Sequence, residues 1–239
     1  MRDKSDSSTL RKALRIPLLA SLLWSTHVAA GNTGAHETAY REALGRLQTA
    51  PALLAEEVDR LRSVEVLHFD YLKYAHIELL RDAKAVRYPP SSLESSQRES
   101  LTDLADEVLR VSAEMEFTLS DFLRGQAALN GALSSTVDIA RSASLHADTE
   151  TEARLVDLGR AATRFRNVQN EENRAALDQA FAALAERPLE LQFRNELAAQ
   201  LAVIDSNSDV AERAITRMNA NGLERAIGQL LDVYERARH

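Results

Sequence analysis

Hydrophobic residues recur at three- and four-residue spacing along most of the chain, which is the period of an amphipathic helix. The most regular stretch is 93–144, which contains no proline. An unbroken helix of this length would rise about 75 Å, so it needs packing partners along its whole length to cover its apolar stripe. Either the helix bends near Gly125 or Gly131, or it is a spine helix that is shared by two stacked antiparallel helical bundles, and we expect the second. Its stripe is formed by Leu101, Leu104, Val108, Val111, Met115, Phe122, Leu129 and Ile139.

Two helical patterns precede the spine. A short amphipathic stretch covers 38–48, and a longer one covers 51–85 with a proline in its first turn, where a missing N–H is tolerated. The two prolines at 89–90 end this helix because neither can continue a helix interior. Ser91 and Glu94 have the spacing of a capping box, which predicts that the spine begins there.

Shorter helices are predicted after the spine. Asp148 or Thr149 is a suitable N-terminal cap for one helix, and Asn170 is suitable for the next. A polar run at 205–209 predicts a turn. The rest of the chain should therefore divide into helices at 188–204, 210–219 and 223–238.

The composition agrees with helices and excludes several classes of protein. Aromatic residues make up 5% of the 239 residues, and cysteine is absent. The absence of cysteine excludes disulfide scaffolds, thiolate zinc sites, iron–sulfur clusters and cysteine nucleophiles. The formal net charge of −7 argues against a nucleic-acid partner, which normally meets a basic face. We predict an all-α domain over 31–239, with a long-helix part at 38–144 and a shorter-helix part at 148–239.

The first thirty residues have the pattern of an export signal. A basic start precedes an apolar run at 16–24, which is too short to cross a bilayer core of about 30 Å. Small residues at Val28 and Ala30 predict cleavage after Ala30. The mature chain is then expected in the periplasm or another extracytoplasmic space, without a membrane span. The alternative is an uncleaved anchor that extends the apolar run through 25–30.

The chain carries no recognisable catalytic or cofactor motif. It has no glycine-rich phosphate loop, no nucleophile elbow and no pair of histidines spaced for zinc on one helix. His68, Asp70 and His76 are close in sequence, but Asp70 would point about 200° away from His68 on a helix. We expect no enzyme activity, no catalytic residues, no cofactor and no metal site.

A ligand site is predicted where the helix at 51–85 faces the middle of the spine. Polar residues stand there at or beside apolar helical rows, which is typical of a pocket for a small molecule. An arginine could hold a carboxylate through two parallel hydrogen bonds, a tyrosine could stack on a ring, and amides could orient the ligand. The alternative is a set of interhelical salt bridges, for example Arg81 with Asp121. The predicted site residues are Tyr74, Glu78, Arg81, Asp82, Arg124, Gln126 and Asn130.

The pattern of a known domain family is found in two segments, HIELLRDAKAVRYPPSSL and FTLSDFLRGQAALNGALSS. With a closing helix at 230–234, they resemble the DAHL domain, the double all-helical ligand-binding domain of bacterial sensor histidine kinases. The resemblance covers roughly 40–239, and the chain departs from the family pattern at His76, Ala83 and Lys84, where an arginine, a tyrosine and an aspartate are expected. The matching positions are 75–82 in the first segment and Phe122, Gln126, Leu129, Gly131 and Leu133 in the second.

The resemblance implies an extracytoplasmic sensor-like domain. Such a domain binds a small molecule or a protein and relays that state to another protein, in two-component signalling. Because no membrane helix or kinase domain follows in this sequence, we expect a stand-alone domain. Its expected partners are an unidentified small molecule, a membrane sensor protein, or a second copy of the chain in a homodimer. The alternative is a structural or protein-interaction helical module without a small-molecule pocket.

Overall fold

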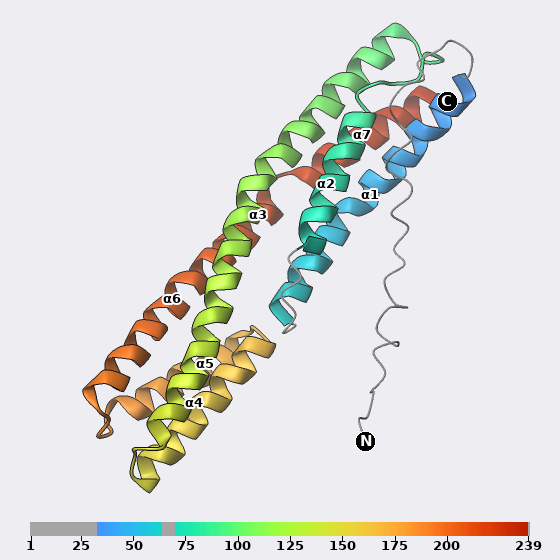
Figure 1. Ribbon diagram of the computed structural model, residues 1–239. Coiled ribbons are helices and arrows are strands. Elements are labelled where there is room, and N and C mark those ends of the chain that lie inside the picture. Colours follow the sequence, from blue (N-terminus) through green and yellow to red (C-terminus); the bar gives the residue numbers. More distant parts are fainter. Residues whose placement is uncertain (1–32, 64–69, 239) are drawn as a thin grey trace, which may run out of the picture. The chain divides into compact units, whose positions relative to one another are not determined.

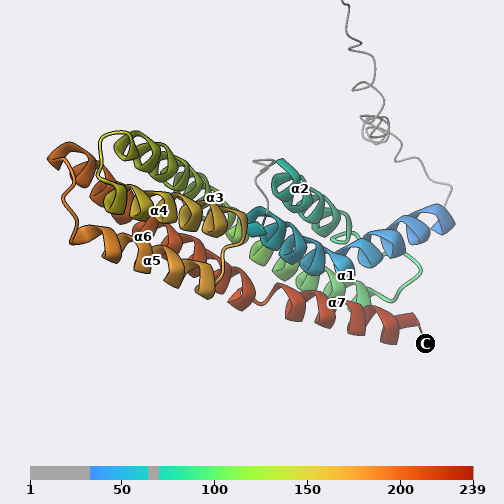
Figure 2. The same cartoon turned by 90° about the horizontal axis from the view of Figure 1, so that it is seen from below.

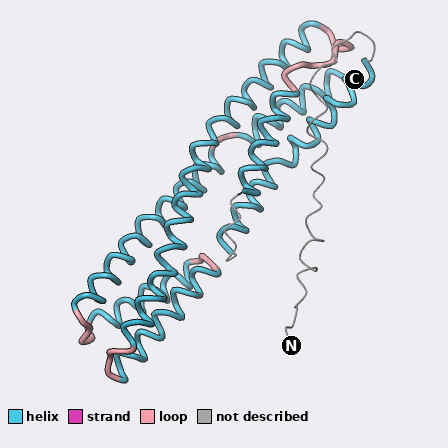
Figure 3. Tube along the Cα trace, in the orientation of Figure 1, coloured by secondary structure: helices cyan, strands magenta, loops and turns pink. Residues whose placement is uncertain are grey.

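The computed structural model describes residues 33–63 and 70–238, and within these ranges every regular element is an α-helix (Figure 3). The predicted all-α helical bundle is therefore confirmed. None of the helices in these ranges is long and apolar enough to cross a membrane. The predicted cleavage site after Ala30 lies outside the described residues. The helices are α1 (Thr33–Ser63), α2 (Asp70–Ala85), α3 (Ser95–Ser144), α4 (Thr149–Asn167), α5 (Glu171–Ala185), α6 (Leu191–Ala220) and α7 (Leu223–Arg238).

The 50-residue helix α3 is the element on which most of the others pack. It contacts α2, α4, α6 and α7, and α6 runs beside it in both ribbon views (Figures 1 and 2). Its apolar stripe is covered along its length, with Val108, Phe122 and Leu133 all fully buried. A helix about 75 Å long thus finds the partners that its pattern requires.

The buried hydrophobic side chains form two separate clusters. The first core takes residues from α1, α2, the first half of α3, the last turns of α6, and α7. The second core takes residues from the second half of α3, from α4 and α5, and from the first half of α6. Two helices, α3 and α6, therefore contribute to both cores, whereas the sequence predicted this role for the spine alone.

The turn predicted at 205–209 is wrong, because α6 passes through these residues without a break. Tertiary contacts satisfy the polar side chains of the run. Asp205 forms an ion pair with Arg174 of α5, and Ser208 accepts a hydrogen bond from the same guanidinium at 3.3 Å. Asn207 donates to a carbonyl one turn earlier in its own helix, at 2.8 Å. With these partners the polar residues do not interrupt the helix.

The helix predicted to begin near Pro51 is also wrong. Pro51 lies inside α1, and the chain leaves α1 at Ser63 and enters α2 at Asp70. A proline in a helix interior costs about 3 kcal/mol. Leu47 and Leu54 are buried on either side of it, and the first core thereby offsets the lost hydrogen bond.

The helix caps were predicted with mixed success. Asp148 accepts a hydrogen bond from the backbone N–H of Thr151, and Asn170 caps α5 in the same way, both at 2.8 Å. The start of α3 differs, because its N-cap is Glu94 and the capping box is completed by Gln97. The capping box predicted from Ser91 is therefore wrong, and α3 begins at Ser95.

Candidate functional site

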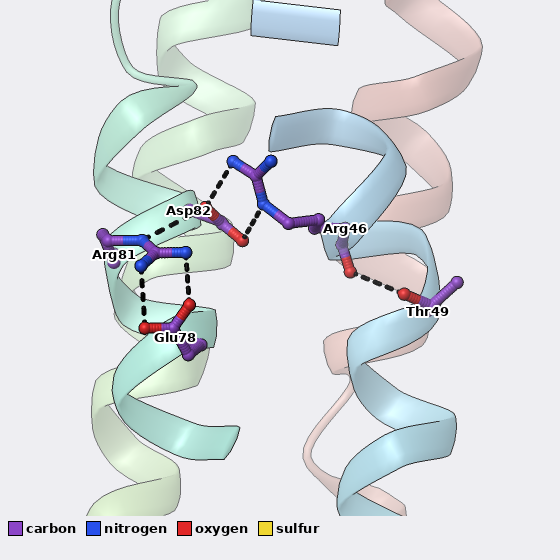
Figure 4. A network of polar contacts seen from close by, with 5 residues as sticks. All are labelled: Arg46, Thr49, Glu78, Arg81 and Asp82. Carbon is purple, nitrogen blue, oxygen red and sulfur yellow. Dashed lines mark hydrogen bonds and ion pairs between the residues drawn. The ribbon is translucent and has the colours of Figure 1, made fainter. Parts of the chain in front are cut away.

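The predicted site residues on α2 pair with one another or with α1, apart from the solvent-exposed Tyr74. Figure 4 shows Asp82 between two arginines. Asp82 is 3% exposed, and its carboxylate accepts two hydrogen bonds from Arg46 of α1, at 2.9 and 3.0 Å. Arg81 donates to Glu78 at 2.8 Å, and both side chains are about half exposed. The carboxylate of Asp82 is therefore used to hold α2 against α1.

The predicted residues on α3 face different neighbours. Arg124 is largely exposed, and its closest carboxylate is that of Asp121, at 3.6 Å. Gln126 is fully buried, and its side-chain amide donates to the main-chain carbonyl of Leu61 at 3.0 Å. The side-chain oxygens of Gln126 and Asn130 are buried without a hydrogen-bond partner among the described residues. Gln126 therefore bonds to α1, not to α2.

The seven residues do not line one cavity. The salt bridge considered as the alternative, Arg81 with Asp121, is not formed either, because each of these residues pairs within its own helix. A groove does lie where α2 faces α3. The structure describes all seven predicted residues, and Arg124 is the one among them that lines this groove. The location predicted for the site thus has a cavity, but most of its walls are other side chains.

The α2–α3 groove has a volume of 470 Å³, within the range of about 300–1,000 Å³ that is usual for ligand pockets. Two buried leucines, Leu72 of α2 and Leu119 of α3, form its apolar part. The remaining walls are mixed, with charged side chains and partly exposed apolar ones. They are Lys73, His76 and Ile77 of α2 and Glu116, Ser120, Leu123, Arg124 and Ala127 of α3.

The charges of the α2–α3 groove favour an anion. Lys73 and Arg124 contribute two positive charges and Glu116 contributes one negative charge. Among the described residues Lys73 has no ion pair, and Arg124 has a long one at 3.6 Å. His76 is held by the carbonyl of Ser112, 2.8 Å from its Nε2, which must therefore carry a proton. A small organic anion with an apolar body fits these walls.

Helical spacing could have identified more of this groove. Lys73 and Ile77 are four residues apart, so they share a face of α2. On α3, the wall at Glu116, Ser120 and Leu123 continues in steps of three and four residues to Ala127. The sequence interpretation selected polar residues beside apolar rows, whereas half of the residues that line this groove are apolar.

A second cavity, of 930 Å³, lies where the end of α1 meets α4, α5 and α6. Its arginines are already paired, because Arg62 donates to Glu212 at 2.6 Å and Arg174 to Asp178 at 3.0 Å. Charge pairs that are satisfied within the protein offer a ligand less than unpaired ones. The α2–α3 groove is therefore the stronger candidate.

The residues at 33–63 and 70–238 contain no cluster of metal ligands. No group of three or more histidine or carboxylate side chains in these ranges could hold a metal ion. Burial raises the pKa of the Tyr40 hydroxyl above its usual range, but this ring packs against Tyr234 in the first core, at 5.2 Å between centroids. The perturbed tyrosine therefore does not line the α2–α3 groove.

The chain matches no protein-family model, no curated protein and no solved structure.

Proposed function

We propose that this protein is an exported, sensor-like helical domain that binds a small organic anion in the α2–α3 groove. The single observation that carries the proposal is the pair of cations, Lys73 and Arg124, over an apolar wall in a groove of 470 Å³. An arginine and a lysine supply several donors to a carboxylate, and the leucines accept an apolar body. The resemblance to the DAHL domain supports the same function class.

The position of the groove supports a relay. The helix α2 packs on α1 and α3, and α3 continues from the first core into the second. A ligand that binds one position of α2 more tightly than another would shift the population toward that position. We propose that a membrane sensor protein in two-component signalling receives this change.

The test is calorimetry with a panel of aromatic and aliphatic carboxylates. Lys73→Ala and Arg124→Ala should each weaken binding by about tenfold or more, which is the usual loss for one charged hydrogen bond. Arg160→Ala is the matched control, because Arg160 is similarly exposed and has the same 3.6 Å pair with an aspartate one turn earlier. Equal losses in all three variants, or no binding by any carboxylate, would contradict the proposal.

Export can be tested separately. N-terminal sequencing of protein from the extracytoplasmic fraction should find Gly31 as the first residue. Intact Met1 in a cytoplasmic pool would contradict the leader prediction. A neighbouring gene for a membrane kinase would support the relay.

A protein-interaction module is the second candidate function. The observation that favours it is the set of large apolar side chains that stay exposed near the groove: Tyr74 and Ile77 of α2 are 64% and 55% exposed, and Phe117 of α3 is 79% exposed. A pull-down can identify a protein partner. If Phe117→Asp abolishes binding of that partner while no carboxylate binds the protein, a protein-interaction function explains these residues better than a sensor function.

A further inference from the structure

A different groove, between α5 and α6, has no role in the function proposed above. The helix α5 packs chiefly on α4, and α6 packs chiefly on α3, so the seam between α5 and α6 is left open. A groove of 520 Å³ runs along this seam. Its apolar walls are Phe181, Ala182, Leu184 and Ala185 of α5, Leu189 of the connection, and Leu197, Ala198 and Leu201 of α6.

The groove is long and narrow. Its α5 wall extends from Arg174 to Ala185, which is about 16 Å along the helix axis. The 520 Å³ are spread along this length, so a slender extended chain fits along the α5–α6 groove.

The two ends of the groove differ in charge. Arg194 stands at the end near the α5–α6 connection, where its guanidinium donates to the carbonyl of Arg187 at 3.1 Å. No carboxylate among the described residues pairs with it. At the other end Arg174 lies between Asp178 and Asp205 and forms ion pairs with both. The uncompensated positive charge is thus at one end only.

We propose that the α5–α6 groove binds a free single-chain carboxylate amphiphile of the fatty-acid type. The alkyl chain lies along Phe181, Leu197 and Leu201, and the carboxylate lies at Arg194. The apolar walls favour the chain because each buried methylene group leaves water. The single guanidinium favours a negative head group and fixes the direction of the chain.

Calorimetry on the full chain with octanoate, decanoate and dodecanoate, below the concentrations at which micelles form, tests the proposal. Affinity should rise on the order of tenfold for each two methylene groups added. Dodecylamine should bind more weakly than dodecanoate, because its ammonium group would face Arg194. Affinity that does not depend on chain length would overturn the proposal.

Two neighbouring alanines on α6 give a matched pair of variants. Ala198 lines the groove and Ala199 does not, and both are exposed, so a larger side chain at either position need not disturb a core. Ala198→Phe should reduce dodecanoate affinity by at least about tenfold, as expected when several buried methylene groups are displaced. Ala199→Phe should leave it unchanged. Circular dichroism and melting temperature check that both variants fold.

The head-group contact has its own variant. Arg194→Ala should weaken dodecanoate binding by about tenfold or more and leave dodecanol binding unchanged. Two results would assign the groove to another occupant: loss of a homodimer in Ala198→Phe without any dodecanoate binding, or Ala198-dependent binding to phosphatidylglycerol vesicles without binding of the free carboxylate. Either result would overturn the proposal. Because none of these residues lines the α2–α3 groove, failure here would leave the sensor proposal unaffected.

Discussion

Gln126, in the middle of α3, donates a hydrogen bond from its side-chain amide to the main-chain carbonyl of Leu61, in the last turn of α1, at 3.0 Å. The last carbonyls of a helix have no partner within the helix, so this bond satisfies one of them. It forms beside the point where α3 passes from the first core, which ends at Phe122, to the second, which begins at Leu129. A residue predicted to orient a ligand thus anchors one helix to another.

Gln126→Ala should destabilise the protein by about 2 kcal/mol, because the carbonyl of Leu61 loses its partner and a buried cavity opens. Urea unfolding measures the change as a lower midpoint. Gln48→Ala is the control, since Gln48 is exposed on α1 and should change the stability by less than about 0.5 kcal/mol. Similar midpoints for the two variants would mean that the bond to Leu61 contributes little.

The ion pair between Arg46 and Asp82 should matter more than its exposed neighbour. Arg46→Ala leaves a buried carboxylate with weaker compensation, and it should cost about 2 kcal/mol of unfolding free energy. Arg81→Ala removes a half-exposed pair with Glu78 and should cost less than about 1 kcal/mol. Thermal and urea unfolding of both variants measure the difference.

A double variant separates two effects of Arg46→Ala: the loss of the attraction to Asp82, and the cost of a buried carboxylate that has lost its partner. Adding Asp82→Asn to Arg46→Ala removes the buried charge, so the double variant should be more stable than Arg46→Ala alone. If the second substitution destabilises the protein further, the carboxylate must be stabilised by other groups.

Two glycines of α3 should respond to alanine in different ways. Gly131 is exposed, and a Cβ atom there would meet nothing within 4 Å, so Gly131→Ala should stabilise the protein by about 0.5–1 kcal/mol. At Gly125 a Cβ atom would lie 3.1 Å from Val210 and 3.4 Å from the backbone oxygen of Asn207. Gly125→Ala should therefore raise the free energy of unfolding by less than Gly131→Ala does.

A larger residue makes the contrast sharper. Gly125→Leu should lower the melting temperature, because α3 and α6 approach closely at this point and cannot accommodate the side chain. Gly131→Leu should not lower it. Equal melting temperatures for the two leucine variants would show that α6 can move away without cost.

The N-cap formed by Asp148 should stabilise the protein to an extent that depends on pH. The hydrogen bond from the backbone N–H of Thr151 lowers the pKa of the Asp148 carboxyl, so its stabilisation is complete above the pKa of the unfolded chain and is lost as the pH falls through the folded value. Asp148→Asn keeps a capping oxygen but does not titrate. The melting temperature of the wild type minus that of this variant should be largest near neutral pH. This difference should become smaller when the pH is lowered below about 4. A constant difference from pH 7 to pH 3 would contradict the assignment.

Interactions within a few residues could be read from the sequence. The apolar stripe of α3 and the caps at Asp148 and Asn170 depend on side chains and backbone groups within about one turn of the helix, so their spacing alone indicates them. The all-α fold and the unbroken length of α3 follow from the same local periodicity.

The partners of polar side chains depended on the fold. Asp205 and Ser208 read as a turn, but Arg174 of another helix satisfies them and α6 continues. Asp82 and Gln126 were polar residues without a visible partner, and each found one on α1, 36 and 65 residues away. Helical spacing shows which face a residue occupies, but only the packing of the helices decides which other helix meets that face and whether a polar group remains for a ligand.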